Sequence, residues 1–171
     1  AMATLPLDAT AVGAADADKN TTIAAQEAGI IVSVEAHDGD TVKTGDLIAK
    51  LDDRTVKANL DKDKALLARD QATLAQAETA LTRAEALRRR NAGTQQTADE
   101  ARASRDTALA TVQSDKASIS ADQVAVEHTV IRAPFDGKLG DIAISTGAYL
   151  STGAAVVTIA QYDPIYVKFH L

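Results

Sequence analysis

The sequence predicts an α+β fold in which two similar β segments are separated by a long antiparallel pair of helices. The first observation is a repeat, because the outline of residues 29–51 returns 108 residues later as residues 137–159. The second is a change of composition, since proline disappears and helix-forming residues dominate from Asp53 to His128. A duplicated β unit interrupted by a helical hairpin is therefore the architecture that the chain favours.

Glycines and apolar residues carry the repeat in one register. Aligned without a gap, the two segments superimpose Ile31 on Leu139 and Ile48 on Val156. Glycines at tight turns are expected wherever the backbone needs a positive φ. The six glycines that share the register are Gly29, Gly39, Gly45, Gly137, Gly147 and Gly153. We assign residues 22–52 to the first β half and residues 129–160 to the second.

The segment 53–128 between the halves reads as two helices. Leucines recur every seven residues in its first part, and valine and isoleucine do so in its second part, as expected for two helices that share one seam. These residues are Leu60, Leu67, Leu74 and Leu81, followed by Val112, Ile119 and Val126. Asp63, Asp70 and Arg105 make the seam polar in places, which predicts a thin coiled coil of modest stability.

A turn at residues 91–97, here called the tip, separates the two helices. Gly93 is expected to end the first helix, and the run from Thr97 to Glu100 has the spacing of a capping box that would start the second. Two helices joined by so short a turn run antiparallel. With roughly 35 to 39 residues each, at about 1.5 Å per residue, they give a hairpin on the order of 50–60 Å long.

The two ends of the chain are expected to form part of a β-barrel. Residues 1–21 can supply one strand, whose edge would be unsatisfied unless it pairs with residues 165–171. We therefore assign residues 1–21 to an N-terminal strand and residues 161–171 to the beginning of a barrel domain.

Composition narrows the function classes. The net charge of −6 argues against nucleic-acid binding, and the absence of cysteine excludes disulfides and thiolate metal sites. No apolar run approaches the roughly 18 residues of a spanning helix. Any membrane association is expected to come through partners or through other segments of the protein.

No catalytic or cofactor site stands out. The histidines, His37, His128 and His170, are scattered, and there is no Ser-His-Asp spacing, phosphate-cradling loop or paired-carboxylate pocket. We expect a protein that is not an enzyme and that holds no cofactor and no metal. Three arginines at residues 88–90 are read as a solvated helix end that favours the helix dipole.

The two glycine-punctuated halves resemble the biotinyl/lipoyl domain, a flattened β sandwich with quasi-twofold symmetry. Carrier members of that family bear a modified lysine, often in an Asp-Lys-Ala setting. This chain has that sequence around Lys64, but the family's lysine would fall near Thr55, and Lys64 lies in the helical pattern. A carrier domain therefore remains the less favoured alternative, together with a purely structural coiled-coil scaffold.

A lipoyl-like sandwich split by a helical hairpin resembles the periplasmic adaptors, or membrane fusion proteins, of tripartite efflux pumps. The sequence VIRAPFDGKLG at residues 130–140 is similar to the start of the second lipoyl half in that family. YDPIYVKFHL at residues 162–171 is similar to its first barrel strand in the resistance-nodulation-division (RND) class. At the hairpin turn, the resemblance implies a channel-binding set formed by Arg83, Leu87 and Thr94, with Gln95 and Gln96 beside them.

This resemblance implies partners and a location. A periplasmic adaptor would link an inner-membrane RND drug/proton antiporter to a TolC-type outer-membrane channel, would be attached to the inner membrane, and would associate into a ring, as a hexamer or a trimer of dimers. Arg83, Leu87 and Thr94 keep the family spacing R-x3-L-x6-S, with threonine in place of serine. An adaptor of an ABC-type or type I secretion exporter is the alternative within the same class.

Overall fold

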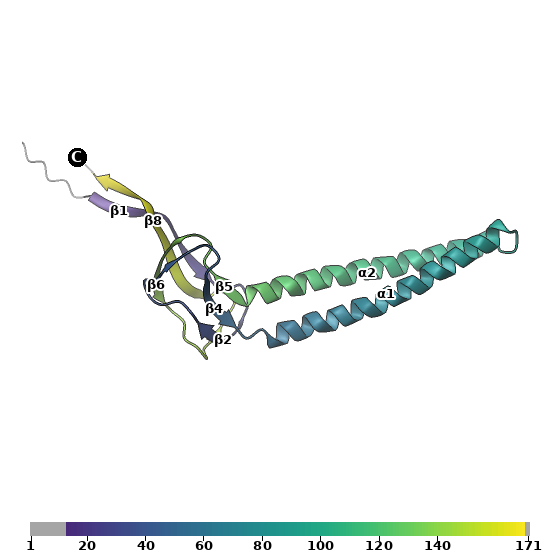
Figure 1. The fold of residues 1–171 in the computed structure, drawn as a ribbon, viewed down its shortest axis with the longest axis horizontal. Coiled ribbons are helices and arrows are strands. Elements are labelled where there is room, and N and C mark those ends of the chain that lie inside the picture. Colours follow the sequence, from purple (N-terminus) through teal and green to yellow (C-terminus); the bar gives the residue numbers. More distant parts are fainter. Residues whose placement is uncertain (1–12, 170–171) are drawn as a thin grey trace, which may run out of the picture. The chain divides into compact units, whose positions relative to one another are not determined.

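The computed structural model describes residues 13–169, and the surroundings of side chains from residue 20 to residue 161. It divides into two compact units, one made of residues 1–51 and 130–171 and the other of residues 52–129. The first is a β sandwich and the second a helical hairpin (Figure 1). The predicted α+β class, with a split sandwich and an inserted hairpin, is confirmed.

Eight strands and two helices make up the described residues. In chain order they are β1 (Gly13–Ala24), β2 (Gly29–Val34), β3 (Thr41–Val42), β4 (Leu47–Leu51), α1 (Arg54–Arg89), α2 (Gln95–His128), β5 (Val130–Arg132), β6 (Gly137–Ile142), β7 (Tyr149–Leu150) and β8 (Ala155–Phe169).

The sandwich consists of two four-stranded sheets, with strand orders β1-β8-β6-β3 and β5-β4-β2-β7. Moving each residue of the first half along the chain by 108 positions turns β2 into β6 and β3 into β7. The short strands are exchanged, because β3 pairs with β6 and β7 pairs with β2. Neither half can therefore complete its own sheet without the other.

Equivalent residues of the two halves fill the core of the sandwich. Ile48 and its counterpart Val156 are fully buried, and so are Leu51 and its counterpart Ile159. Each such side chain contributes roughly 1.5–3 kcal/mol relative to an exposed one. The apolar register seen in the sequence is thus the register of one shared core.

The terminal strands β1 and β8 pair antiparallel from Gly13 opposite Phe169 to Ala24 opposite Ala155. The sequence left the edge of the N-terminal strand unsatisfied unless it met the C-terminal segment, and the two do pair, with β1 beginning inside the segment 1–21. Residues 1–12 and 170–171 lie outside the described part of the chain.

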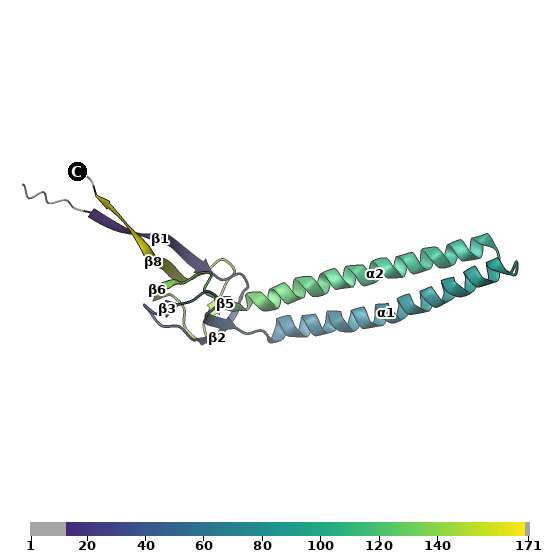
Figure 2. The same cartoon turned by 45° about the horizontal axis from the view of Figure 1, so that its top comes forward.

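The helices α1 and α2 run antiparallel, with 36 and 34 residues (Figure 2). At about 1.5 Å per residue, α1 is on the order of 54 Å long. Neither helix carries an apolar stretch that would let it cross a bilayer.

The seam between the helices follows a heptad pattern of buried and half-buried residues. We call the following set the seam: Leu60, Asp63, Leu67, Asp70, Leu74, Ala77, Leu81 and Ala84 in α1, with Ala98, Ala101, Arg105, Ala108, Val112, Asp115, Ile119, Asp122 and Val126 in α2. The leucines, valines and isoleucine predicted from the sequence all belong to it. The polar members predicted from the sequence belong to it as well, and two further aspartates join them.

Candidate functional site

The helix α1 ends at Arg89, two residues before the tip. The residue that leaves the helix with a left-handed backbone is Asn91, at φ 56°, and not Gly93. The N–H of Ala92 then donates to the carbonyl of Leu87 at 2.9 Å, which satisfies one of the free carbonyls at the helix end. The expectation that Gly93 ends the helix is therefore wrong, because asparagine tolerates the left-handed region well enough to serve.

Gly93 is needed for space. A Cβ on this residue would lie 3.2 Å from the Cβ of Leu87 and 3.3 Å from the backbone nitrogen of Arg88. Glycine thus lets the returning chain pass directly over the last turn of α1. The sequence shows a glycine at the tip but does not reveal which of these two roles it has.

The helix α2 begins at Gln95, with Thr94 as its N-cap. The Thr94 hydroxyl oxygen accepts a hydrogen bond from the backbone N–H of Thr97 at 3.1 Å, and the two threonine hydroxyls lie 2.8 Å apart. The predicted capping box at Thr97 is wrong, since the cap lies three residues earlier. Thr94 is followed three positions later by threonine instead of glutamate, so the usual signature of a capping box is missing there.

Of the five residues singled out in the sequence analysis, Leu87, Thr94, Gln95 and Gln96 lie at or beside the turn, and Arg83 lies about one helical turn before Leu87 on α1. The Arg83 side chain is exposed on α1, and within the described residues no ion pair of its guanidinium is found. Leu87 is 43% exposed, which is unusual for a leucine beside a helix seam. Together they present a cation and an apolar knob next to the turn.

The two glutamines are held in place along α2. The Arg88 guanidinium donates to the Gln95 side-chain oxygen at 2.7 Å, and the Gln95 amide donates to Asp99 at 2.8 Å. The Gln96 amide donates to Glu100 at 2.9 Å. These bonds orient the amides without burying them, so the tip keeps exposed polar groups that can bond to a partner.

An ion pair ties the two helices together close to the tip. Arg102 of α2 contacts Glu85 of α1 at 2.9 Å. The pKa of Arg102 is raised by its hydrogen bond to the Glu85 carboxylate and by the negative charge of that carboxylate. At this level the seam is made of small residues, Ala84 and Ala101, which allow close approach of the backbones. The two helices are therefore held close together next to the tip that connects them.

The six repeat glycines do not share one role. Gly39, Gly45, Gly147 and Gly153 have φ between 77° and 90° and lie in turns. Gly29 and Gly137 are instead the first residues of β2 and β6. At Gly137 the reason is close packing, because a Cβ would lie 2.7 Å from the Ala160 carbonyl oxygen.

Neither the lysine of the carrier alternative nor a metal site receives support. Lys64 lies within α1, where its ammonium is 3.7 Å from the Asp61 carboxylate, and Thr55 lies in the first turn of the same helix. Between residues 13 and 169, no three His, Asp or Glu side chains are grouped so that they could hold a metal ion.

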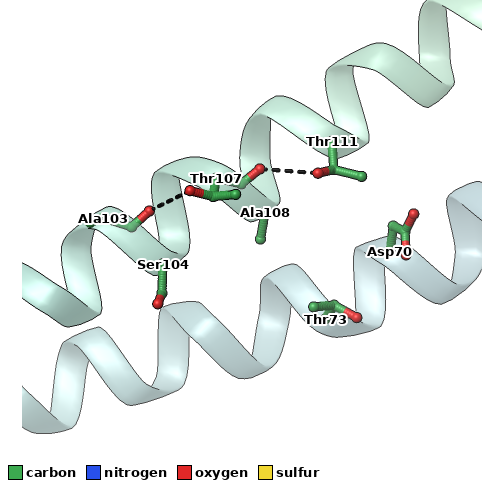
Figure 3. A pocket seen from close by; sticks show the side chains of 7 residues that line it. All are labelled: Asp70, Thr73, Ala103, Ser104, Thr107, Ala108 and Thr111. Atoms are coloured by element: carbon green, nitrogen blue, oxygen red, sulfur yellow. Dashed lines mark hydrogen bonds between the residues drawn. The ribbon is translucent and has the colours of Figure 1, made fainter.

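A groove of about 500 Å³ lies along the hairpin, and the sequence analysis did not anticipate it. Its lining residues are Asp70, Thr73, Ala103, Ser104, Thr107, Ala108 and Thr111 (Figure 3). Thr107 and Thr111 turn their hydroxyls back to carbonyls of their own helix, at 2.9 and 3.1 Å. The groove is therefore lined by methyl groups and small side chains, with one carboxylate, that of Asp70.

Comparison with known proteins gives one family and one fold. Residues 19–161 match the family described as "RND MFP, barrel-sandwich hybrid domain". No curated protein sequence matches the chain significantly.

Three examples illustrate the solved structures that share the fold. MacA from Actinobacillus actinomycetemcomitans is 25% identical with a TM-score of 0.64, covering 91% of this chain and 53% of its own. The membrane fusion protein Spr0693 from Streptococcus pneumoniae R6 is 16% identical with a TM-score of 0.70, covering 93% and 67%. The periplasmic adaptor protein EmrA is 16% identical with a TM-score of 0.52, covering 91% and 76%. The chain thus spans about half the length of MacA.

Proposed function

The chain belongs to the membrane fusion protein family, and on that premise we propose that it is a periplasmic adaptor subunit, whose hairpin tip docks on an outer-membrane channel of the TolC type. The observation that carries the proposal is the end of the hairpin, where Arg83 and Leu87 are exposed on the last turns of α1, beside a turn that is fixed by its own hydrogen bonds. A rigid turn loses little entropy when it binds.

Each tip residue has a part in the proposed contact. Arg83 can donate charge-assisted hydrogen bonds to acceptors on the channel, and Leu87 can enter an apolar hollow between its helices. Gln95 and Gln96 supply amide donors and acceptors. Thr94 contributes mainly by holding α2 at its start, because its oxygen already accepts from the N–H of Thr97.

A contact of a few side chains is weak by itself, and the proposal therefore includes a ring. Several copies, as a hexamer or a trimer of dimers, would present several tips at once and raise the avidity. At its other end the ring would meet an inner-membrane transporter. The protein would be periplasmic and attached to the inner membrane.

The transporter is proposed to be an RND drug/proton antiporter. The description of the matching family, RND MFP, supports this choice. An adaptor of an ABC-type or type I secretion exporter would use the same sandwich and hairpin, and it remains the alternative within the class. On either reading the chain acts by joining two membrane proteins and has no catalytic role of its own.

An export assay in the cells that make this protein tests the docking. Arg83→Asp should abolish export because it reverses the charge at the tip, while circular dichroism shows an intact hairpin. Lys64→Asp is the matched control, since it makes the same charge change on the exposed side of α1 away from the tip. Full export by the Arg83→Asp strain would contradict the proposal, and loss of export by Lys64→Asp would favour the carrier alternative.

Photocrosslinking from position 87 identifies the partner directly. With a photoreactive amino acid in place of Leu87, the proposal expects an outer-membrane channel among the captured proteins. The same probe at Lys64 should not capture it. Capture of only a second copy of the chain at position 87 would count against docking by the tip.

A further inference from the structure

Four aspartates interrupt the half of the seam that lies away from the tip. Asp63 and Asp70 are seven residues apart on α1, and Asp115 and Asp122 are seven residues apart on α2. They alternate with Leu67, Leu74, Ile119 and Val112, so they occupy positions where a coiled coil normally places apolar side chains. In the half next to the tip, alanines hold the corresponding positions.

These carboxylates are poorly compensated. Asp70 is only 9% exposed, and Asp115 and Asp122 each bury an Oδ2 that has no hydrogen-bond partner among the described residues. Two cations lie close, both on α1: Arg69 bonds Asp70 at 2.8 Å, and Lys62 is 3.3 Å from Asp63. Buried carboxylate oxygens without partners are unfavourable, so the ionised seam opposes its own closure.

The antiparallel register that the Arg102–Glu85 pair fixes places Asp70 and Asp115 at nearly the same level of the seam, one on each helix, and each carboxyl shifts the pKa of the other. Figure 3 shows Asp70 on the part of α1 that lies next to α2. Two carboxyls can share a hydrogen bond only if one of them carries a proton. The charged groups that act on Asp70 are Arg69 from α1 and Asp115 from α2. Those that act on Asp115 are Asp70, Asp63 and Arg69, all from α1.

The proton belongs on Asp115. Burial raises the pKa of Asp115, and the charge of Asp70 raises it further, with a smaller contribution from Asp63. The pKa of Asp70 is lowered, chiefly by its hydrogen bonds with Arg69. A carboxyl whose pKa is raised by folding stabilises the closed form at acidic pH, and this stabilisation disappears as the pH rises through the raised pKa.

We propose that the Asp70–Asp115 pair makes the hairpin proton-sensitive: one shared proton holds the two helices together along residues 60–74 and 112–126, and its loss loosens them there. The part next to the tip has no such carboxylates in its seam and stays closed. The hairpin would thus change its stiffness with pH while the geometry of the tip is preserved. This inference concerns the hairpin alone and does not depend on the identity of the channel or the transporter.

Distances between spin labels on the two helices provide the test. The chain has no cysteine, so labels can be placed on Gln71→Cys with Ser114→Cys beside the aspartates, and on Thr82→Cys with Ala103→Cys nearer the tip. All four positions are exposed. Pulsed electron paramagnetic resonance is recorded at about pH 3.5, below the ordinary aspartate pKa of about 3.9, and at about pH 8.

The expected result is a shift to longer and more widely distributed distances at the higher pH for the pair at 71 and 114, with no change for the pair at 82 and 103. In the Asp70→Asn/Asp115→Asn variant the distances should be short and narrow at both pH values, because the amides can bond without a proton. Asp61→Asn, an exposed carboxylate on α1, should leave the wild-type response intact. Equal distributions at both pH values in the wild type, or a pH response retained by the double variant, would overturn the proposal.

Discussion

The backbone N–H of Gly45 donates a hydrogen bond of 2.8 Å to the carbonyl of Ala133, in the other half of the sandwich. The same bond exists between the equivalent residues, since the N–H of Gly153 donates to the carbonyl of Ala25, also at 2.8 Å. The repeat is therefore preserved down to individual hydrogen bonds. Each half holds the other through its second glycine turn, which explains how a chain interrupted by 78 residues of hairpin still closes one sandwich.

The symmetry predicts equal effects of alanine at the two glycines. Gly45 and Gly153 have φ of 90° and 83°, and an added Cβ would meet no atom within 4 Å at either site. Gly45→Ala and Gly153→Ala should each lower the free energy of unfolding of the sandwich by about 1–2 kcal/mol, the cost of a left-handed backbone for an L-residue.

Urea unfolding followed by the amide signals of β2 and β6 measures these changes. Gly137→Ala serves as the contrast, because its Cβ would lie 2.7 Å from a carbonyl oxygen, and it should cost more than either turn variant. Markedly different losses for Gly45→Ala and Gly153→Ala would show that the two turns are not equivalent in energy.

The cap of α2 gives a second prediction. Thr94→Ala removes the oxygen that accepts from Thr97, and it should lower the stability of the hairpin by about 1 kcal/mol, whereas Thr94→Ser should retain most of it. Thermal unfolding monitored at the helix band reports the change. Thr82→Ala is the control, since that hydroxyl bonds only to a carbonyl of its own helix. If Thr97→Ala alone carried the loss, the cap would have been assigned to the wrong residue.

Two residues of the tip allow a third prediction, opposite to what the sequence suggests. Asn91→Gly should keep or slightly raise the stability of the hairpin, and Asn91→Ala should lower it by about 1 kcal/mol, because Asn91 has φ 56°. Gly93→Ala should be destabilising through the contact with Leu87. The same thermal measurement decides, and a neutral Gly93→Ala would show that the turn can move aside.

Much of the fold could be predicted because it depends on periodic patterns. The shared register of glycines and apolar residues in residues 29–51 and 137–159 predicted the two β halves. The recurrence of leucine every seven residues from Leu60 to Leu81 predicted the first helix of the hairpin. Such patterns arise because one face of a strand or helix is buried. They can be read from the sequence even when the residues that the face contacts lie far away along the chain.

The details of the tip could not be predicted because they depend on local backbone geometry. Thr94 and Thr97 are both acceptable caps, and Asn91 and Gly93 can both end a helix, so only the path of the turn decides between them. The meeting of Asp70 with Asp115 depends on the register between the helices, which is set by the length of that turn. The polar seam was foreseen from Asp63 and Asp70, but their partners on α2 were not.

Acid should act on the sandwich in the opposite sense to its action on the hairpin. Asp136 accepts from the backbone N–H of Thr44 at 2.6 Å and from its hydroxyl at 2.8 Å. These two bonds lower the pKa of Asp136, the backbone bond contributing most. A carboxyl whose pKa is lowered by folding stabilises the fold above its unfolded pKa of about 3.9, and this contribution is lost as the pH falls through that range.

Urea unfolding of the sandwich between about pH 7 and about pH 3 tests this, with the amide signals of β2 and β6 as the probe. Asp136→Asn should be less stable than the wild type at neutral pH. The difference should shrink toward pH 3, because the carboxyl of the unfolded wild type, with a pKa of about 3.9, then takes up a proton that the folded state must release. Asp141→Asn, an exposed carboxylate of the same unit, should follow the wild type throughout. If the free energies of unfolding of the wild type and of Asp136→Asn differed by the same amount at every pH, the charge of Asp136 would not be the source of its stabilising effect.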